Sequence, residues 1–281
     1  RPMTRFVLLA CRPLTLILAL VCAPVCMLSP AFSAEIVRAG GTGSGTVLLQ
    51  KLAELYRQNK PASEIRIITP PLGSSGGFRA LAAGQIDVVI SGRPPKAEEG
   101  QFKIVEYART PFIFASGDAK QAKGFSLSEI IEIYAGTRKT WGDGRQIRLV
   151  LRSPFESDTQ TMTSISPAMR NAVGSALARR AGPVGEDDLD TVDLIGKLPG
   201  SLGPTTLGLL RLLDRRLTAM PVDGITPSLE TLADGRYPYA KSLFLVTRLQ
   251  NDAATTDFLH FLQSSAAHNF LRRTDHLPGF H

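Results

Sequence analysis

The chain has 281 residues, of which 43% are hydrophobic and 20% are charged, and this composition excludes a disordered or collagen-like protein. The formal net charge is +7, but Arg1, Arg5 and Arg12 all precede Glu35, the first acidic residue. The rest of the chain therefore has 29 basic and 25 acidic residues, a charge of +4. No cluster of Lys and Arg with interleaved aromatic residues is present, so we expect no nucleic-acid partner.

The first 34 residues have the order of a secretory signal peptide. Two arginines precede an apolar run at 14–28, and a segment of mostly small residues follows at 31–34. We expect residues 1–34 to be removed by cleavage after Ser33 or Ala34, and the mature protein to be periplasmic. A retained membrane anchor is the alternative, because the apolar run approaches the length that spans a bilayer.

The three cysteines all precede this expected cleavage site, at Cys11, Cys22 and Cys26. The mature chain is therefore predicted to have neither a disulfide bond nor a thiolate metal site. The four histidines are too scattered to indicate a metal site, and we expect no metal ion and no cofactor.

Three predicted strands at the start of the mature chain each end in a loop of small residues. The strands lie at Ile36–Ala39, Ile65–Thr69 and Ile86–Ile90. The loops are Gly40–Gly45, Gly73–Gly77 and Ser91–Pro94. Apolar residues at helical spacing predict helices at Thr46–Gln58 and Phe78–Ala83. Strands that alternate with helices indicate an α/β protein with a parallel sheet covered on both faces.

The remaining elements are predicted in the same way. Further strands are expected at Phe112–Ala115, Ile147–Leu151, Ile195–Thr206, Leu217–Met220 and Leu243–Thr247. Ser126 and Glu129 form a capping box for a helix, and another helix at Thr255–Leu271 closes the chain. A polar cluster at 152–159 makes a fourth loop at a strand end, and the acidic segment at 183–190 is predicted to be a surface loop.

We divide the mature chain into two lobes. Residues 35–116 and 207–281 are assigned to the first lobe, and residues 117–206 to the second. The polar stretch before Gly124 is interpreted as the first crossing between them.

The four loops together are suited to a small oxyanion. Backbone N–H groups at helix N-termini and hydroxyl groups donate hydrogen bonds to its oxygens, and an arginine supplies charge. Ligands of parallel sheets gather at the carboxyl ends of the strands, which is where these loops lie.

An enzymatic alternative depends on the second loop. Gly73-Ser74-Ser75-Gly76-Gly77 has the spacing of a nucleophile elbow between a strand and a helix, with Ser75 as the nucleophile of a Ser hydrolase. The candidate bases are His260, His268, His276 and His281. Because His260 and His268 lie on a predicted terminal helix and no HGGG-like oxyanion loop is present, we favour a protein that is not an enzyme.

The chain resembles the phosphate-binding proteins of ABC importers, a branch of the type II periplasmic solute-binding proteins. The similarity rests on four segments: GSSGG at 73–77, IDVVISGRP at 86–94, SLSEIIEIYAGTRKTWGDGRQI from Ser126 and VDGITPSLETLADGRYPYAKSLFLVT from Val222. The resemblance implies a two-lobed α/β fold with a ligand cleft between the lobes.

It also implies a set of ligand contacts, which come from the loops. The first loop contributes Ser44, with Thr42 or Thr46 as the alternatives, and the second contributes Ser74 and Ser75. The third contributes Gly92, and the fourth contributes Arg152, Ser157, Asp158 and Thr159. Arg152 is the only positive side chain that the resemblance places against the ligand.

Two positions depart from the family pattern. Gly92 stands where the family has an aspartate that accepts a hydrogen bond from protonated phosphate, and Asp158 replaces a glycine. We therefore expect weaker discrimination between phosphate and sulfate, unless Asp158 or Glu156 reaches the cleft. An aspartate at position 92 is expected to restore the discrimination if the backbone there accommodates a side chain.

The resemblance implies a monomeric periplasmic protein that captures inorganic phosphate or a similar tetrahedral oxyanion. Its partner is then an ABC permease at the inner membrane. A third possibility is an anion-sensing module that contacts a membrane signalling protein, because transport and sensing differ in their partners and not in the pocket.

Overall fold

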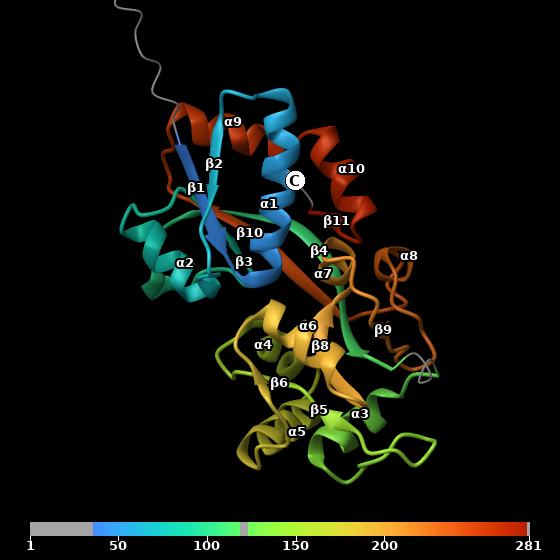
Figure 1. Ribbon diagram of the computed structural model, residues 1–281. Coiled ribbons are helices and arrows are strands. Elements are labelled where there is room, and N and C mark those ends of the chain that lie inside the picture. The colour runs from blue at the N-terminus through green and yellow to red at the C-terminus, as the bar shows by residue number, and fades with distance from the viewer. Residues whose placement is uncertain (1–35, 119–122, 280–281) are drawn as a thin grey trace, which may run out of the picture. The chain divides into compact units, whose positions relative to one another are not determined.

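A nine-stranded mixed sheet runs through the computed structural model, which describes residues 36–118 and 123–279 (Figure 1). The expected signal peptide and the three cysteines lie outside these residues. The strands are β1 (Ile36–Gly41), β2 (Glu64–Ile67), β3 (Val88–Ser91), β4 (Lys103–Ser116), β5 (Arg148–Leu149), β6 (Leu151–Arg152), β7 (Val184–Gly185), β8 (Ser201–Thr206), β9 (Thr218–Ala219), β10 (Ala240–Thr247) and β11 (Leu277–Pro278).

The helices follow the strands in chain order. They are α1 (Gly43–Asn59), α2 (Gly73–Ala82), α3 (Leu127–Ala135), α4 (Ser157–Ile165), α5 (Pro167–Ala178), α6 (Asp188–Lys197), α7 (Leu207–Leu212), α8 (Leu229–Ala233), α9 (Ala253–Leu262) and α10 (Ser265–Arg273). Within the described residues, no helix is both long enough and apolar enough to cross a membrane.

The main sheet has the strand order β2-β1-β3-β10-β4-β8-β5, with β9 and β11 also paired to β4. β1 pairs in parallel with β2 and β3, as expected for strands joined through helices. β10 is antiparallel to both β3 and β4, and β8 is antiparallel to β4, so the sheet is mixed. The predicted parallel pairing holds for the three strands on which it rested, β1, β2 and β3, and does not extend to β4, β8 and β10. β6 and β7 form a separate parallel pair.

The first lobe has hydrophobic clusters on both faces of this sheet. Val88 and Ile90 of β3 pack with α1, α9 and α10, whereas Val89 between them packs with α2. β10 divides in the same way, because Leu243 and Leu245 belong to the first cluster and Val246 to the second. Successive side chains of a strand point to opposite faces, so a continuous apolar run is what a sheet covered on both faces requires.

The second lobe repeats this arrangement on the far half of β4. Phe112 and Phe114 pack with α3 and α5, while Ile113 and Ala115 pack with α6 and α7. The near half of β4 pairs with β10, and the far half pairs with β8. β4 therefore belongs to both lobes, and the sequence analysis found only the second half of it (Figure 1).

Several boundaries differ from those that the sequence predicted. α1 and α2 begin within the glycine-rich segments that were expected to be loops, at Gly43 and Gly73. The predicted strand at 147–151 is two short strands in different sheets, and the predicted closing helix is divided into α9 and α10. The acidic segment at 183–190 is not only a surface loop, because α6 begins there with a buried aspartate, Asp188.

His276 lies in the interior beside α7 and is 1% exposed. Its Nδ1 is 3.2 Å from Thr274 Oγ1, and its ring packs so closely on Gly208 that a Cβ there would lie 2.3 Å from the ring carbon Cε1. Burial lowers the pKa of His276 to about 4, although a hydrogen bond with the Thr274 backbone acts to raise it.

We predict that His276 makes folding stability sensitive to mild acid. The folded-state pKa is below the unfolded value of 6.5, so unfolding takes up a proton. The stability contribution is complete above pH 6.5 and decreases by about 3 kcal/mol as pH falls to 4. Urea unfolding of His276→Gln at several pH values should show a smaller loss over this window. The exposed His260→Gln is the control, and equal losses in the wild type and His276→Gln would contradict the prediction.

Candidate functional site

Three of the ten α-helices in the described part of the chain begin without a capping side chain of their own. They are α1, α2 and α4, whereas the N-cap side chains of the other seven accept a hydrogen bond from the first turn. The first turn of a helix presents unpaired N–H groups and the positive end of the helix dipole. These three uncapped turns hold most of the residues that the sequence analysis assigned to the ligand: Ser44, Thr46, Ser74, Ser75, Ser157, Asp158 and Thr159.

The first turn of α1 lies against a carboxylate from the second lobe. The Ser44 N–H donates to Asp188 Oδ2 over 2.9 Å, and the Thr42 hydroxyl donates to the same oxygen over 3.4 Å. Ser44 Oγ and Thr46 Oγ1 are buried and have no hydrogen-bond partner. The α1 end of the site therefore has two donors that Asp188 satisfies and two hydroxyls without a partner.

Lys241 lies between the two lobes and is 1% exposed. It comes from β10, and its ammonium group forms ion pairs with Asp158 of α4 and with Asp188 Oδ1, the latter at 3.2 Å. Both carboxylates are also buried. One ammonium group therefore joins β10 to the starts of α4 and α6.

Arg152 is the second buried cation, with 2% of its surface exposed. Nη1 donates to the Gly185 carbonyl over 3.0 Å, and Nη2 donates to Glu156 over 3.2 Å. Nε has no hydrogen-bond partner; it lies 3.9 Å from Asp158, and Nη2 lies 4.0 Å from Asp188. The guanidinium is therefore held in place by protein and still has an unused donor.

The positive and negative groups of this cluster affect one another's pKa strongly because water is excluded. Burial acts to raise the pKa of Asp188, but the charges of Lys241 and Arg152 and the Ser44 N–H lower it well below its usual range. Burial raises the pKa of Asp158, and the negative charge of Asp188 adds to this effect. Burial acts to lower the pKa of Lys241, but the two aspartates outweigh it and raise the pKa. Asp188 and Lys241 are therefore ionised near neutral pH.

A contact at Gly92 closes the other side of the site. The Gly92 N–H donates to Ser74 Oγ over 3.1 Å, which joins the end of β3 to the first turn of α2. A Cβ at Gly92 would lie 2.5 Å from Ser157 Oγ and 3.3 Å from Lys241 Cε. There is no space for a side chain here, so the condition under which an aspartate at position 92 was expected to restore anion discrimination is not met.

Ser75 and Thr159 have different surroundings from the other site residues. Ser75 is exposed, and its Oγ accepts a hydrogen bond of 2.8 Å from Arg93, which is itself paired with Glu99. Thr159 Oγ1 donates to the Arg152 carbonyl over 3.2 Å. Thr159 therefore supports the backbone that carries Arg152.

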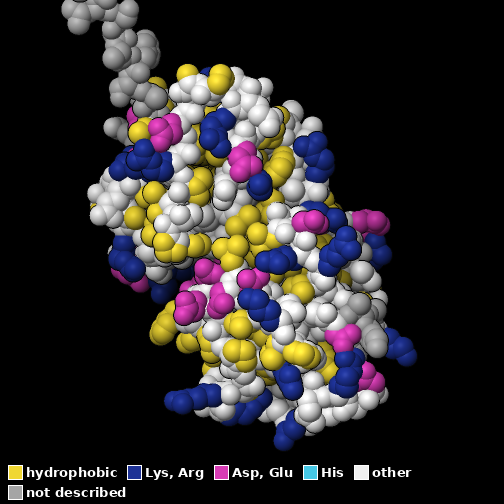
Figure 2. Space-filling model, in the orientation of Figure 1, with side chains coloured by type: hydrophobic (Ala, Val, Ile, Leu, Met, Phe, Trp, Pro, Cys, Tyr) yellow, Lys and Arg dark blue, Asp and Glu magenta, His cyan; other side chains and the backbone are white. Residues whose placement is uncertain are grey.

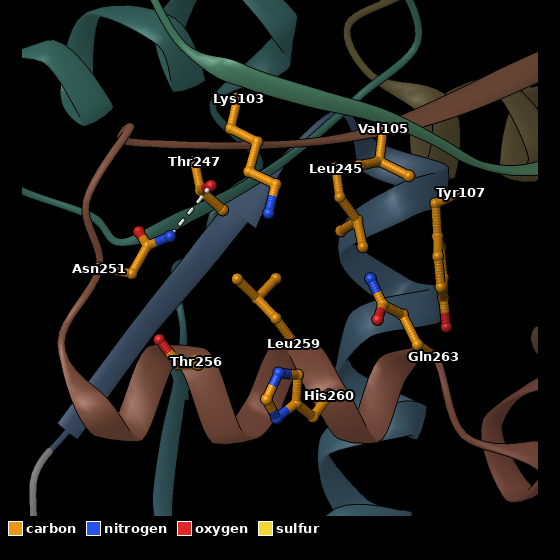
Figure 3. A pocket seen from close by; sticks show the side chains of 10 residues that line it. All are labelled: Lys103, Val105, Tyr107, Leu245, Thr247, Asn251, Thr256, Leu259, His260 and Gln263. Atoms are coloured by element: carbon orange, nitrogen blue, oxygen red, sulfur yellow. Dashed lines mark hydrogen bonds between the residues drawn. The ribbon is translucent and has the colours of Figure 1, made fainter. Parts of the chain in front are cut away.

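The histidines considered as hydrolase bases lie in other surroundings. His260 lines a cavity of about 140 Å³ between the sheet and α9 (Figure 3). Its other lining residues are Lys103, Val105, Tyr107, Leu245, Thr247, Asn251, Thr256, Leu259 and Gln263. His276 is buried beside Gly208, His268 is on α10, and His281 lies outside the described residues. Ser75 is not among the residues that line the His260 cavity.

The sequence analysis missed Lys241 and Asp188. Lys241 had a visible signal, since it is a charged residue two positions before the predicted strand at Leu243–Thr247. Asp188 is one of four acidic residues at 186–190 and had no feature that marked it as the buried one. In the described residues, no three His, Cys, Asp or Glu side chains form a group that could hold a metal ion.

Comparison with known proteins identifies the fold. A family model described as a PBP superfamily domain matches residues 29–266. The phosphate-binding protein PstS of Bacillus subtilis is 27% identical over 236 residues, covering 79% of this chain and 75% of the relative. PstS of Borreliella burgdorferi is 22% identical, and the match covers 84% of this chain and 88% of the relative.

A solved structure is also similar. It is described as a phosphate ABC transporter substrate-binding protein from Clostridium perfringens, with bound phosphate. The TM-score is 0.75 at 19% identity, with 88% of this chain and all of the other chain covered. The mixed α/β architecture is therefore the two-lobed periplasmic binding protein fold.

We predict that Lys241 is essential for the stability of the junction between the lobes. Lys241→Met leaves two buried carboxylates without their cation and should cost about 3–5 kcal/mol of unfolding free energy, measured in urea. Adding Asp158→Asn should recover part of this loss, because one of the stranded charges is removed. Lys197→Met, at an exposed position of α6, is the matched control. A Lys241→Met protein as stable as this control would refute the prediction.

We also predict that Gly92→Ala is destabilising because of overpacking, by about 1–3 kcal/mol. The added methyl group meets the side chain of Ser157, so Gly92→Ala should cost less in a Ser157→Gly background. Thermal unfolding of the four proteins in this cycle measures the coupling. Independent effects of the two substitutions would show that Gly92 and Ser157 do not touch in solution.

Proposed function

Because the chain belongs to the PBP superfamily, we propose that it is a periplasmic phosphate-binding protein that delivers its ligand to an ABC importer. The observation that carries the proposal is the group of three uncapped helix starts, α1, α2 and α4, at one site with the buried guanidinium of Arg152. Helix N-termini and arginine are the donors that bind phosphate oxygens in proteins.

The unused donors fit a tetrahedral oxyanion. Ser44 Oγ, Thr46 Oγ1 and Arg152 Nε are all buried without a hydrogen-bond partner. Leaving a buried donor unpaired costs about 1–3 kcal/mol, and a charged one costs more. An anion with four oxygens that accepted hydrogen bonds from these groups would remove that cost.

Asp158 supports a preference for phosphate over sulfate. It pairs with Lys241 and lies 3.9 Å from Nε of Arg152, which supports replacement of the missing carboxylate at Gly92 from the other lobe. A carboxylate accepts a hydrogen bond from protonated phosphate, whereas it faces only lone pairs on fully ionised sulfate. We therefore propose that the protein discriminates between these anions in spite of Gly92.

We propose that the protein acts as a monomer with a hinge between its lobes. The chain division at 116/117 and 206/207 stays a prediction. The hydrophobic clusters support crossings within β4, near Pro111, and before β10, near Ala240. In the structure the start of α1 and the end of β3 already contact the starts of α6 and α4 in the second lobe, so the hinge would open from this arrangement.

The proposed protein is not an enzyme. Support comes from the relatives, which are named as phosphate-binding proteins, and from Ser75, whose hydroxyl accepts a hydrogen bond from Arg93. A permease at the inner membrane is the proposed partner, and export by the N-terminal segment the proposed route. The hydrolase and the anion-sensing module have no comparable support.

Binding of added anions tests the proposal. In a thermal-shift panel of phosphate, sulfate and molybdate, phosphate should raise the unfolding midpoint most. At a hundredfold excess over Kd, the expected gain in unfolding free energy is about 2.7 kcal/mol. Arg152→Ala should weaken phosphate binding by about 1.5–3 kcal/mol, or 10- to 150-fold, in titration calorimetry.

Arg170→Ala, at an exposed position of α5, is the control for this substitution. Equal losses of affinity in both variants would indicate nonspecific attraction, and no stabilisation by any anion would refute the proposal.

A further inference from the structure

The carboxylate of Asp188 makes the contacts that a bound oxyanion is expected to make. It accepts from the first-turn N–H of Ser44 and from the Thr42 hydroxyl, and it pairs with Lys241. We propose that Asp188 is an internal competitor of the ligand, which must displace it from the start of α1. This inference rests on the proposed function and adds to it a residue that sets the threshold for binding.

The geometry of the contact resembles recognition of an anion more than an ordinary helix cap. A usual N-cap side chain belongs to the residue that begins its own helix, but Thr42 does not cap α1 and Asp188 is 146 residues away. The fit is close, since a Cβ at Gly43 would lie 2.5 Å from Asp188 Oδ2. Only a glycine at this position lets the carboxylate approach the backbone of the first turn.

The charge balance of the site also points to competition. Two buried cations, Arg152 and Lys241, face three carboxylates, Asp158, Asp188 and Glu156. An incoming anion added to this set would leave an excess of negative charge in a region that excludes water. Figure 2 shows that further acidic side chains gather on the surface over α4 and α6. Withdrawal of one carboxylate removes this repulsion and releases donors for the ligand.

Such a competitor would act as a filter on the ligand. A carboxylate attached to the protein has a high effective concentration at the site, so an anion that merely replaces it gains little. Phosphate gains more, because it also reaches the unpaired hydroxyls of Ser44 and Thr46 and the unpaired Nε of Arg152. Chloride and simple carboxylates offer too few acceptors to reach all of these donors.

Phosphate titrations of Asp188 variants test the inference. Asp188→Asn and Asp188→Ala should bind phosphate at least tenfold more tightly than the wild type in calorimetry. Their unfolding midpoints without added anion should be lower, because Lys241 and the α1 start lose a partner. Asp190→Asn is the matched control, since Asp190 is in the same first turn and accepts from the Glu186 N–H. Its phosphate affinity should equal that of the wild type.

A second measurement uses acetate as the probe. The space left in Asp188→Ala should admit the small carboxylate, so acetate should raise its unfolding midpoint and compete with phosphate. The wild type and Asp190→Asn should not respond. A purely structural Asp188 predicts the opposite pattern, in which the variants lose stability and phosphate affinity together.

The outcomes separate the two proposals. If the wild type binds phosphate and the Asp188 variants bind it equally or more weakly, the competitor is refuted while the proposed function stands. If no protein of the series binds phosphate, the proposed function fails and the competitor with it. If the variants do not fold, a crystal structure of the wild type with phosphate decides. A Ser44 N–H that still donates to Asp188 in that complex overturns the inference, and one that donates to phosphate supports it.

Discussion

The ammonium group of Lys241, buried between two aspartates, is the interaction on which the junction of the lobes depends. A charge without water must be paired, so β10, α4 and α6 cannot separate without exposing or stranding one of these groups. The same requirement fixes Asp158 and Asp188 close to Arg152 and to the start of α1. The same charged side chains therefore stabilise the junction and surround the proposed ligand site. A ligand has to enter a group of charges that is already nearly neutral.

The sequence predicted the first lobe better than the second for a physical reason. β3 is a continuous apolar run and the first helix has clear periodicity, so local pattern and tertiary structure agree there. β4 was half missed because charged residues, Lys103, Glu106 and Arg109, interrupt the apolar residues of its first half, which is held in the sheet by pairing with β10. The two-residue strands β5 and β6 likewise exist only through distant partners.

At the site, short motifs predicted the donors but not the charges that surround them. GSSGG and the polar cluster at 152–159 led to Ser74, Arg152 and Ser157 through the family resemblance, and Ser74 and Ser157 lie at helix starts. Asp188 and Lys241 became part of the site through contacts 144 and 53 residues apart in the chain. Gly92 shows the same limit. Its role as a contact for Ser157 is visible only once the two lobes are folded together.

The balance of these charges explains how a buried site can remain selective for an anion. Cations alone would bind any anion and would repel each other in the dry interior, so carboxylates are needed to hold Arg152 and Lys241 there. Each carboxylate that stabilises the cations also takes up donors that a ligand requires. Selectivity then depends on how many donors remain unused after the internal pairs have formed. Among the described side chains of the proposed site these include two hydroxyls and one guanidinium N–H, a set that a single tetrahedral anion with several acceptor oxygens would satisfy and a spherical ion would not.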